Sequence, residues 1–171
     1  MSIGGQNESE QKVYRLTPEG YAKNKDLLEY LSTVKRKEIA DYIHDAKEAG
    51  DISESSAYED AKNEQAMVEG KIMELKHLLE KATVMTADMH DDVAGPPSVR
   101  IGMQVDLTSS TGTNRVFKIV ETFEADPKTG MISDQSPVGK ALMGHKVNDV
   151  VEVSTPGGVT SYTIRSIRPM L

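Results

Sequence analysis

Two long stretches with helical periodicity fill the first half of the chain. A segment from 19 to 50 contains no proline, and its apolar residues recur mostly at intervals of three and four. The second stretch is more regular and sustains a coiled-coil seam over about three heptads. Its seam positions are Tyr58, Ala61, Gln65, Val68, Ile72, Leu75 and Leu79. Because only a few residues separate the two helices, they must fold back on each other as an antiparallel hairpin.

The first helix has a clear start and an irregular seam. It begins at Thr17-Pro18-Glu19, because threonine is a good N-cap, proline is favoured at the first helical position and glutamate suits the first turn. Its two apolar stripes are Leu27, Leu28, Leu31 and Val34, then Ile39, Tyr42, Ile43 and Ala46. The step from Val34 to Ile39 breaks the heptad by one position, so we expect a local shift of the seam there. Gly20 weakens the first turn slightly.

The second half of the chain carries strand patterns. Residues 87–100 lose the helical pattern and are rich in Gly, Pro, Asp and Ser, which predicts a linker. Alternating or β-branched runs predict strands at 105–108, 116–120, 149–153 and 162–167. Thr155-Pro156-Gly157-Gly158 predicts a hairpin turn between the last two strands. Residues 136–144 predict a short helix, with serine as its N-cap, proline at its first position and glycine just after its end.

These elements predict an α+β protein: an antiparallel coiled-coil hairpin, then a small antiparallel β-sheet domain with one short helix. We expect a tail over residues 1–15, the hairpin over 16–86, the linker over 87–100 and the C-terminal domain over 101–171. In the linker, His90 beside Asp91 and Asp92 has the residue types of a metal site, but a polar linker explains the group better.

Composition excludes several classes of function. The chain has no cysteine, which excludes disulfides, thiolate metal sites and cysteine nucleophiles. No apolar run approaches the roughly 20 residues of a membrane span, and residues 1–11 lack the features of a signal peptide. Residues 1–98 hold 12 lysines and arginines against 20 aspartates and glutamates. Such an acidic helical half is unsuited to gripping duplex DNA. We expect a cytoplasmic protein without a membrane partner.

The tip of the hairpin has the most informative motif. Gly50-Asp51-Ile52-Ser53-Glu54 places two carboxylates three residues apart between the helices. An exposed tip does not wall off a pocket from water, so it makes a poor enzyme by itself. It is well suited to delivering carboxylates into a cavity of another protein. Asp51 followed by Glu54 is also a capping-box arrangement, so a purely structural role remains an alternative.

Together these motifs closely resemble GreA-type transcript cleavage factors over roughly residues 13–171. The matching stretches are the tip with Ala57-Tyr58 and Ala61-Lys62, Leu16-Thr17-Pro18-Glu19-Gly20, Lys35-Arg36 to Ile39-Ala40, Gly70-Lys71-Ile72 to Leu75, and Ser136 to Gly144 with Thr155-Pro156-Gly157-Gly158. The chain departs from the family after Glu54, where Ser55-Ser56-Ala57 replaces the common Asn-Ala-Glu. We expect that departure to change the efficiency of the tip more than its activity.

The resemblance implies a function and a partner. A family member binds bacterial RNA polymerase, and its FKBP-like C-terminal domain docks at the mouth of the secondary channel. The hairpin passes down the channel and reaches the catalytic Mg²⁺, which the polymerase supplies and the free protein does not bind stably. There it strengthens the polymerase's own hydrolysis of the extruded RNA 3′ end. The chain would then be a monomeric accessory factor and not itself an enzyme.

The resemblance also implies roles for individual residues at the tip. Asp51 would support the second Mg²⁺ and Glu54 would orient or deprotonate the attacking water, although these two roles are exchangeable. Lys47 and Lys62 would hold the extruded RNA. The alternative for both lysines is an ordinary solvated side chain paired with Glu48 or Glu59. Tyr58 would pack in the seam, with stacking on an RNA base as its alternative.

A docking surface is implied in the C-terminal domain. It comprises Pro137, Leu142, Met143 and Gly144. For Leu142 and Met143, packing on the sheet is an equally good interpretation. Two other functions compete with cleavage stimulation. The first is an inhibitor that blocks the secondary channel, which the presence of Asp51 and Glu54 disfavours. The second is a self-contained prolyl isomerase or nuclease, which the exposed tip and an aromatic-poor domain disfavour.

Overall fold

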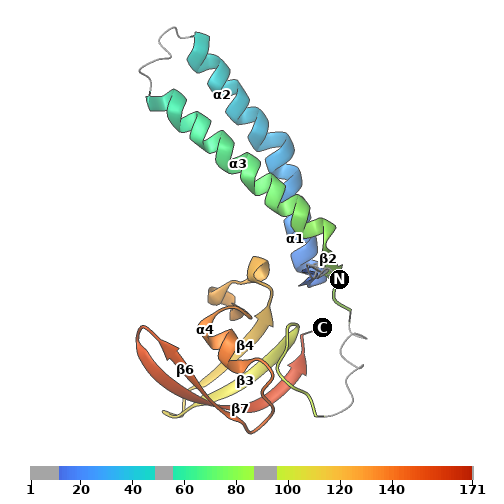
Figure 1. The fold of residues 1–171 in the computed structure, drawn as a ribbon, viewed down its shortest axis with the longest axis vertical. Coiled ribbons are helices and arrows are strands. Elements are labelled where there is room, and N and C mark those ends of the chain that lie inside the picture. The colour runs from blue at the N-terminus through green and yellow to red at the C-terminus, as the bar shows by residue number, and fades with distance from the viewer. Residues whose placement is uncertain (1–11, 49–55, 87–95, 171) are drawn as a thin grey trace, which may run out of the picture.

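A long helical hairpin stands on a small curled β-sheet domain (Figure 1). The computed structural model describes residues 12–48, 56–86 and 96–170. The first arm consists of α1 (Pro18–Tyr30), a π-helix (Leu31–Lys35) and α2 (Arg36–Glu48), and the second arm is α3 (Ser56–Glu80). The predicted antiparallel hairpin is therefore confirmed, and so is the predicted start of its first arm. Thr17 is the N-cap, with its hydroxyl accepting a hydrogen bond from Gly20 N at 2.9 Å.

Two apolar clusters join the arms. The lower cluster consists of Leu16, Leu75 and Leu78, flanked by Tyr14, Tyr21, Leu28, Leu31, Ala82 and Phe123. The upper cluster consists of Ile39, Ile43 and Ala61, flanked by Tyr58 and Val68. Burial of these residues on one side of each helix is what the coiled-coil pattern predicts.

Three predicted seam residues of the first arm are exposed. The side chains of Leu27, Val34 and Tyr42 are 38%, 46% and 52% exposed. At the end of α3 it is Leu78 that is fully buried, whereas the predicted Leu79 is only partly buried. The prediction was wrong at these positions: Val34 lies in the π-helix of the first arm, whereas Leu79 lies near the end of α3 in the second arm. The expected seam shift between Val34 and Ile39 is confirmed, and the π-helix Leu31–Lys35 provides it.

A pair of three-residue strands ties the base of the hairpin together. The strands β1 (Tyr14–Leu16) and β2 (Ala82–Val84) pair in parallel just before α1 and just after α3. Flanking bonds extend the pairing, from Tyr14 N to Lys81 O at 3.1 Å and from Met85 N to Leu16 O at 2.8 Å. These strands were not predicted from the sequence, and they fix the two arms to each other at their lower ends.

The C-terminal domain is a five-stranded sheet in the order β5-β4-β3-β7-β6. Its strands are β3 (Met103–Ser109), β4 (Asn114–Val120), β5 (Met131–Ser133), β6 (Val150–Thr155) and β7 (Gly158–Pro169). The four predicted strands are confirmed as an antiparallel set, and the predicted turn joins β6 to β7. The unpredicted β5 adds in parallel to β4. Two 3-10 turns, Thr122–Glu124 and Pro127–Thr129, lie between β4 and β5.

The predicted short helix is α4 (Pro137–Leu142), which packs on the sheet (Figure 1). The Ser136 hydroxyl caps it by accepting a hydrogen bond from Gly139 N at 3.0 Å, and Gly144 follows its end with a positive φ of 81°. The apolar core lies between the helix and the sheet. Its fully buried members include Val99, Met103, Val105, Leu107, Ile119, Leu142, Val151 and Ile164.

Candidate functional site

The candidate tip residues Asp51 and Glu54 lie outside the described residues, which resume at Ser56 after Glu48. What the structure describes is the frame on either side of them. The α2 helix ends at Glu48 and α3 begins at Ser56, and these two helix ends lie far from the β-sheet domain (Figure 1).

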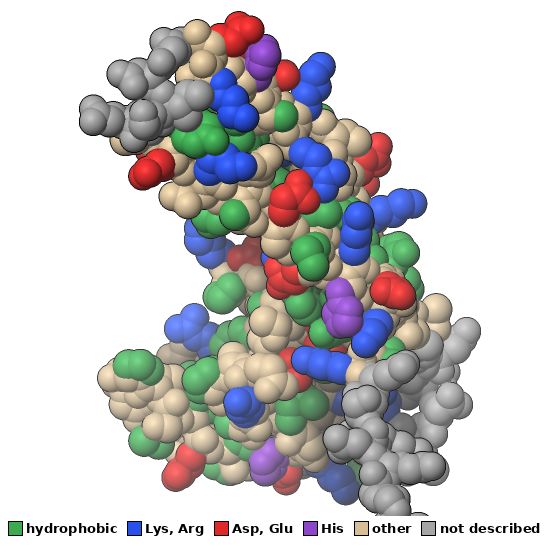
Figure 2. Space-filling model, turned by 45° about the horizontal axis from the view of Figure 1, so that its top comes forward, with side chains coloured by type: hydrophobic (Ala, Val, Ile, Leu, Met, Phe, Trp, Pro, Cys, Tyr) green, Lys and Arg blue, Asp and Glu red, His purple; other side chains and the backbone are tan. Residues whose placement is uncertain are grey.

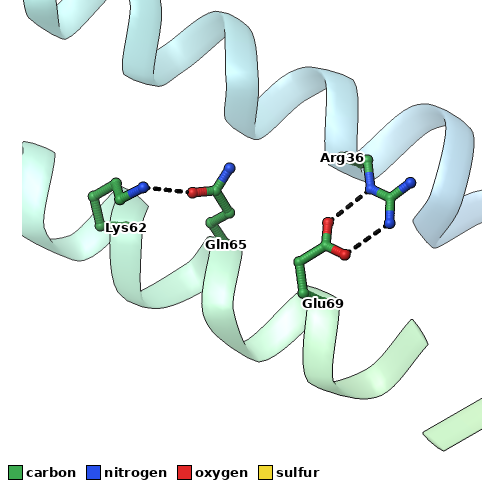
Figure 3. Close-up of polar contacts among 4 residues, drawn as sticks. All are labelled: Arg36, Lys62, Gln65 and Glu69. Carbon is green, nitrogen blue, oxygen red and sulfur yellow. Dashed lines mark hydrogen bonds and ion pairs between the residues drawn. The ribbon is translucent and has the colours of Figure 1, made fainter. Parts of the chain in front are cut away.

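The predicted RNA-contact residues lie near this distal end. Lys47 is exposed in the last turn of α2, and Lys62 is exposed on α3. Lys62 Nζ donates to Gln65 Oε1 at 2.8 Å (Figure 3), which differs from the carboxylate pairing that was its alternative. Tyr58 is partly buried and packs against the upper cluster, as its seam interpretation predicts.

Charged pairs bind the two arms between the clusters. Arg36 Nε and Nη2 donate to the two oxygens of Glu69, each at 2.7 Å (Figure 3). Lys35 Nζ lies 2.7 Å from Glu64 Oε1. Hydrogen bonding within the Arg36–Glu69 pair raises the pKa of Arg36 and lowers that of Glu69. Elsewhere on the visible face of the hairpin, acidic and basic side chains are interspersed (Figure 2).

An open groove lies between the arms near the distal end. Its volume is about 450 Å³. It is lined by Lys35, Glu38, Ile39, Tyr42, Ser56, Ala57, Asp60, Ala61 and Glu64. Among the described residues, no group of three or more His, Cys, Asp or Glu side chains is placed to hold a metal ion.

The base of the hairpin contacts the sheet domain through two buried carboxylates. Glu121 and Glu124 are only 6% and 9% exposed. The Thr17 amide donates to both oxygens of Glu124, at 3.2 and 3.1 Å, and the Thr17 hydroxyl donates to the same carboxylate. The Arg15 amide donates to Glu121 Oε1 at 3.3 Å. These bonds satisfy carboxylates that would otherwise be costly to bury.

An aromatic side chain lies between these carboxylates in sequence and joins the lower cluster. Phe123 meets Tyr14 edge-to-face, with ring centroids 5.4 Å apart and planes at 89°. Phe123 falls within the C-terminal domain expected over residues 101–171. In the structure it packs against the hairpin, so the carboxylates and this ring together form the contact that orients the hairpin on the sheet domain.

Acidification is expected to stabilise the folded protein through these two buried carboxyl groups. Burial raises the pKa values of Glu121 and Glu124 above their ordinary 4.5, although the Thr17 hydrogen bonds partly oppose the shift at Glu124. A carboxyl group with a raised pKa stabilises the folded state more once it is protonated, so this stability appears as the pH falls toward 4.5 and is lost as the pH rises through the raised pKa. Chemical denaturation between neutral pH and about 5 should show a rising free energy of unfolding.

The matched variant for this measurement is Glu124→Gln, which should make the free energy of unfolding less dependent on pH. Glu69 and Asp149 do not complicate this range. Hydrogen bonds lower their pKa values from the ordinary 4.5 and 3.8, so their contribution is lost only at more acidic pH. A free energy of unfolding that falls steadily from neutral pH would contradict the assignment.

Gly20 allows the close approach of Glu124. A Cβ atom at this position would lie 1.8 Å from Glu124 Oε1. We expect Gly20→Ala to displace the carboxylate from Thr17 and to destabilise the protein by about 1–3 kcal/mol, because buried hydrogen-bonding groups lose their partners. The control is Gly70→Ala on α3, where a Cβ meets nothing within 4 Å. That change should stabilise the helix by roughly 0.5–1 kcal/mol. Equal effects of the two substitutions in thermal unfolding would contradict the close approach.

The predicted docking residues separate into a buried one and three exposed ones. Leu142 is 0% exposed and belongs to the core, so it is not available as a surface contact. Pro137, Met143 and Gly144 are exposed around α4, with 37% of the Met143 side chain accessible. Leu142 therefore packs on the sheet, which was the alternative interpretation for this residue. The surface that remains is formed by its exposed neighbours.

Both halves of the chain match described families. Residues 14–84 match the family "Transcription elongation factor, N-terminal", and residues 94–169 match "Transcription elongation factor, GreA/GreB, C-term". A transcription elongation factor GreA from Chloroflexus aurantiacus is 47% identical over 159 residues, which cover 92% of this chain and 99% of the relative. The GreA of Clostridium perfringens is 43% identical over 159 residues, with 92% and 98% covered.

Solved structures give a more distant match. The crystal structure of GreA factor homolog 1 (Gfh1) of Thermus thermophilus is 28% identical, with a TM-score of 0.42, and the match covers 92% of this chain and 99% of that one. The crystal structure of Thermus aquaticus Gfh1 is 29% identical, with a TM-score of 0.41, and the match covers 91% of this chain and 98% of that one.

Among the described residues, none of the helices is both long and apolar enough to cross a membrane.

Proposed function

Because the chain belongs to the GreA/GreB family of transcription elongation factors, we propose that it binds RNA polymerase and stimulates the polymerase's own cleavage of backtracked RNA. In this proposal the hairpin enters the secondary channel and its tip reaches the active site. The RNA 3′ end extruded by backtracking is the second partner. Cleavage makes a new 3′ end in register and releases the arrested complex.

The observation that carries the proposal is the form of the hairpin. The α3 helix has 25 residues, which corresponds to roughly 38 Å at 1.5 Å per residue. Parallel pairing of β1 with β2 and two apolar clusters hold the arms together over this length. A narrow, stiffened rod of two helices can enter a channel that a globular domain cannot. The active end of such a rod is the segment that joins the two arms.

The tip supplies the chemistry. Asp51 and Glu54 are oxygen donors of the kind magnesium prefers, but two carboxylates are too few to hold the ion alone. Mg²⁺ ions held by the polymerase would activate water and stabilise the leaving oxygen of the phosphodiester. The Asp51 carboxylate would help to hold an ion at the polymerase active site. Glu54 would orient the attacking water and accept its proton.

The lysines near the tip support a role in holding RNA. The partner of Lys62 is a neutral amide oxygen, so its charge is not cancelled by that contact. Lys47 is exposed on the opposite arm. In the proposal both ammonium groups contact phosphates of the extruded RNA as flexible point charges. Tyr58 stabilises the distal part of the hairpin by packing against the upper cluster.

The C-terminal domain would dock at the rim of the channel through the exposed residues around α4. Pro137, Met143 and Gly144 form this proposed surface. The buried carboxylate contact between Thr17 and Glu124 would then set the angle at which the hairpin leaves the docked domain. Docking and cleavage thus depend on different residues, which makes them separable by mutation.

A nuclease assay tests whether the protein is an accessory factor. The purified protein with Mg²⁺ is added either to free RNA or to the same RNA held in a stalled RNA polymerase complex. The proposal predicts cleavage only in the complex, because the metal ions and the enclosed site belong to the polymerase. Robust cleavage of free RNA would show a self-contained nuclease and would overturn the accessory role.

A further inference from the structure

The π-helix Leu31–Lys35 lies between the lower and upper clusters of the hairpin. Arg36 N donates to Leu31 O, a hydrogen bond across five residues where an α-helix spans four. The Thr33 hydroxyl donates to Glu29 O at 2.7 Å and so supports the widened turn. Short π segments in α-helices occur often at functional sites.

The extra residue keeps both clusters facing α3. Leu31 flanks the lower cluster and Ile39 belongs to the upper one. In a uniform α-helix, with roughly 100° per residue, Ile39 would lie about 80° around the helix from Leu31. The π turn absorbs one residue, so the remaining rotation comes within about 20° of two full turns. Without this turn, Leu31 and Ile39 would point in directions about 80° apart around the first arm.

Two ion pairs then fix the rotation of α2 relative to α3. Lys35 and Arg36 are consecutive, so their side chains leave the first arm roughly 100° apart. Both nevertheless reach α3, at Glu64 and Glu69 respectively. The Arg36 pair is bidentate, which fixes direction as well as distance (Figure 3). Exposed ion pairs contribute little to stability, so orientation is the effect that this geometry favours.

We propose that the π-helix and these two ion pairs form a positioning element that fixes the rotation of the distal hairpin. The element holds α2 so that Lys47 and Lys62, on opposite arms, face the RNA 3′ end together. Arg36 is a positioning residue in this scheme and does not itself touch the RNA. The inference rests on the proposed function for its consequence in cleavage, but its geometric part is independent of that function.

Deleting Thr33 tests the geometric part. The chain has no cysteine, so spin labels can be attached at chosen sites only. A distal pair, Asp45→Cys with Glu59→Cys, reports the rotation of α2 against α3. A proximal pair, Lys25→Cys with Lys76→Cys, is the matched control. We expect the deletion to shift the distal distance by several ångströms, because α2 turns by about 100°, and to leave the proximal distance unchanged.

The second measurement is transcript cleavage. We expect the deletion to lower the maximal cleavage rate roughly tenfold or more, because small displacements at a reacting centre are costly. The protein concentration that gives half of the maximal rate should change by less than about threefold, since the docking surface is untouched. Arg36→Gln should give a smaller loss, and adding Glu69→Arg to Arg36→Glu should restore most of the rate.

Two outcomes would overturn the inference. The first is an unchanged distal distance in the deletion variant. The second is a loss of cleavage that merely parallels a fall in melting temperature. In that case Arg36→Gln and the charge-swapped pair would change the cleavage rate no more than their changes in stability explain. If the wild-type protein stimulates no cleavage at all, the proposed function fails instead, and the spin-label distances alone decide whether the π-helix sets the rotation.

Discussion

Replacing Asp51 with alanine is expected to abolish stimulated transcript cleavage while leaving polymerase binding within a few fold. The substitution removes a carboxylate that the proposal assigns to a metal ion at the reacting phosphate. Groups that act directly on metal or proton transfer contribute roughly 10²–10⁴-fold to the rate. Cleavage rates of a backtracked complex, measured over a series of factor concentrations, separate the maximal rate from the apparent affinity.

Two further variants control for helix capping. Asp51→Asn keeps a good N-cap residue but removes the charge, so it should lose cleavage almost as completely as the alanine variant. Ser56→Ala, at the start of α3, should retain cleavage. If Asp51→Asn cleaves like the wild type, Asp51 caps a helix and the metal role is wrong. If binding collapses together with cleavage, the tip is an anchor.

Leu142→Ala is expected to cause the largest loss of stability among the variants considered. The side chain is 0% exposed and lies in the core between α4 and the sheet. Truncating a buried leucine to alanine costs about 2–5 kcal/mol, through lost burial and the cavity left behind. Chemical denaturation should show this loss, and any weakening of polymerase binding should follow from unfolding of the C-terminal domain.

The neighbouring methionine provides the matched control. Met143 is 37% exposed, so Met143→Ala should change the free energy of unfolding by about 0.5 kcal/mol or less. It should nevertheless raise the factor concentration needed for half-maximal cleavage, with full activity recovered at high concentration. Similar losses of stability in the two variants, or unchanged polymerase binding in Met143→Ala, would contradict the assignment of Met143 to the docking surface.

The parts of the fold that sequence predicts are those with a sustained period. The α3 seam spans several turns, and the irregular step from Val34 to Ile39 correctly marks the seam shift that the π-helix provides. The α4 helix has only six residues, and so short a period cannot tell Leu142 from Met143. The three-residue strands β1, β2 and β5 are likewise too short to show alternation.

The contact between hairpin and sheet domain was missed for a different reason. It joins Thr17 to Glu124, which are 107 positions apart in the sequence. No local pattern connects such residues. Gly20 seemed only a weak position in a helix, whereas its missing side chain makes room for the Glu124 carboxylate. The burial of Glu124 also has no signal in the sequence, because a glutamate in a polar stretch is usually exposed. The tip site is still a prediction, made from the residue types of the short motif Gly50-Asp51-Ile52-Ser53-Glu54.

The central claim is tested most directly by adding the purified protein to a stalled, backtracked RNA polymerase complex with 3′-labelled RNA and Mg²⁺. The account predicts rapid release of short labelled 3′ fragments and resumed elongation when nucleotides are added. Absence of fragments, together with slowed nucleotide addition, would contradict it. That result would mean that the hairpin occupies the channel as an inhibitor and that Asp51 and Glu54 serve mainly to cap a helix.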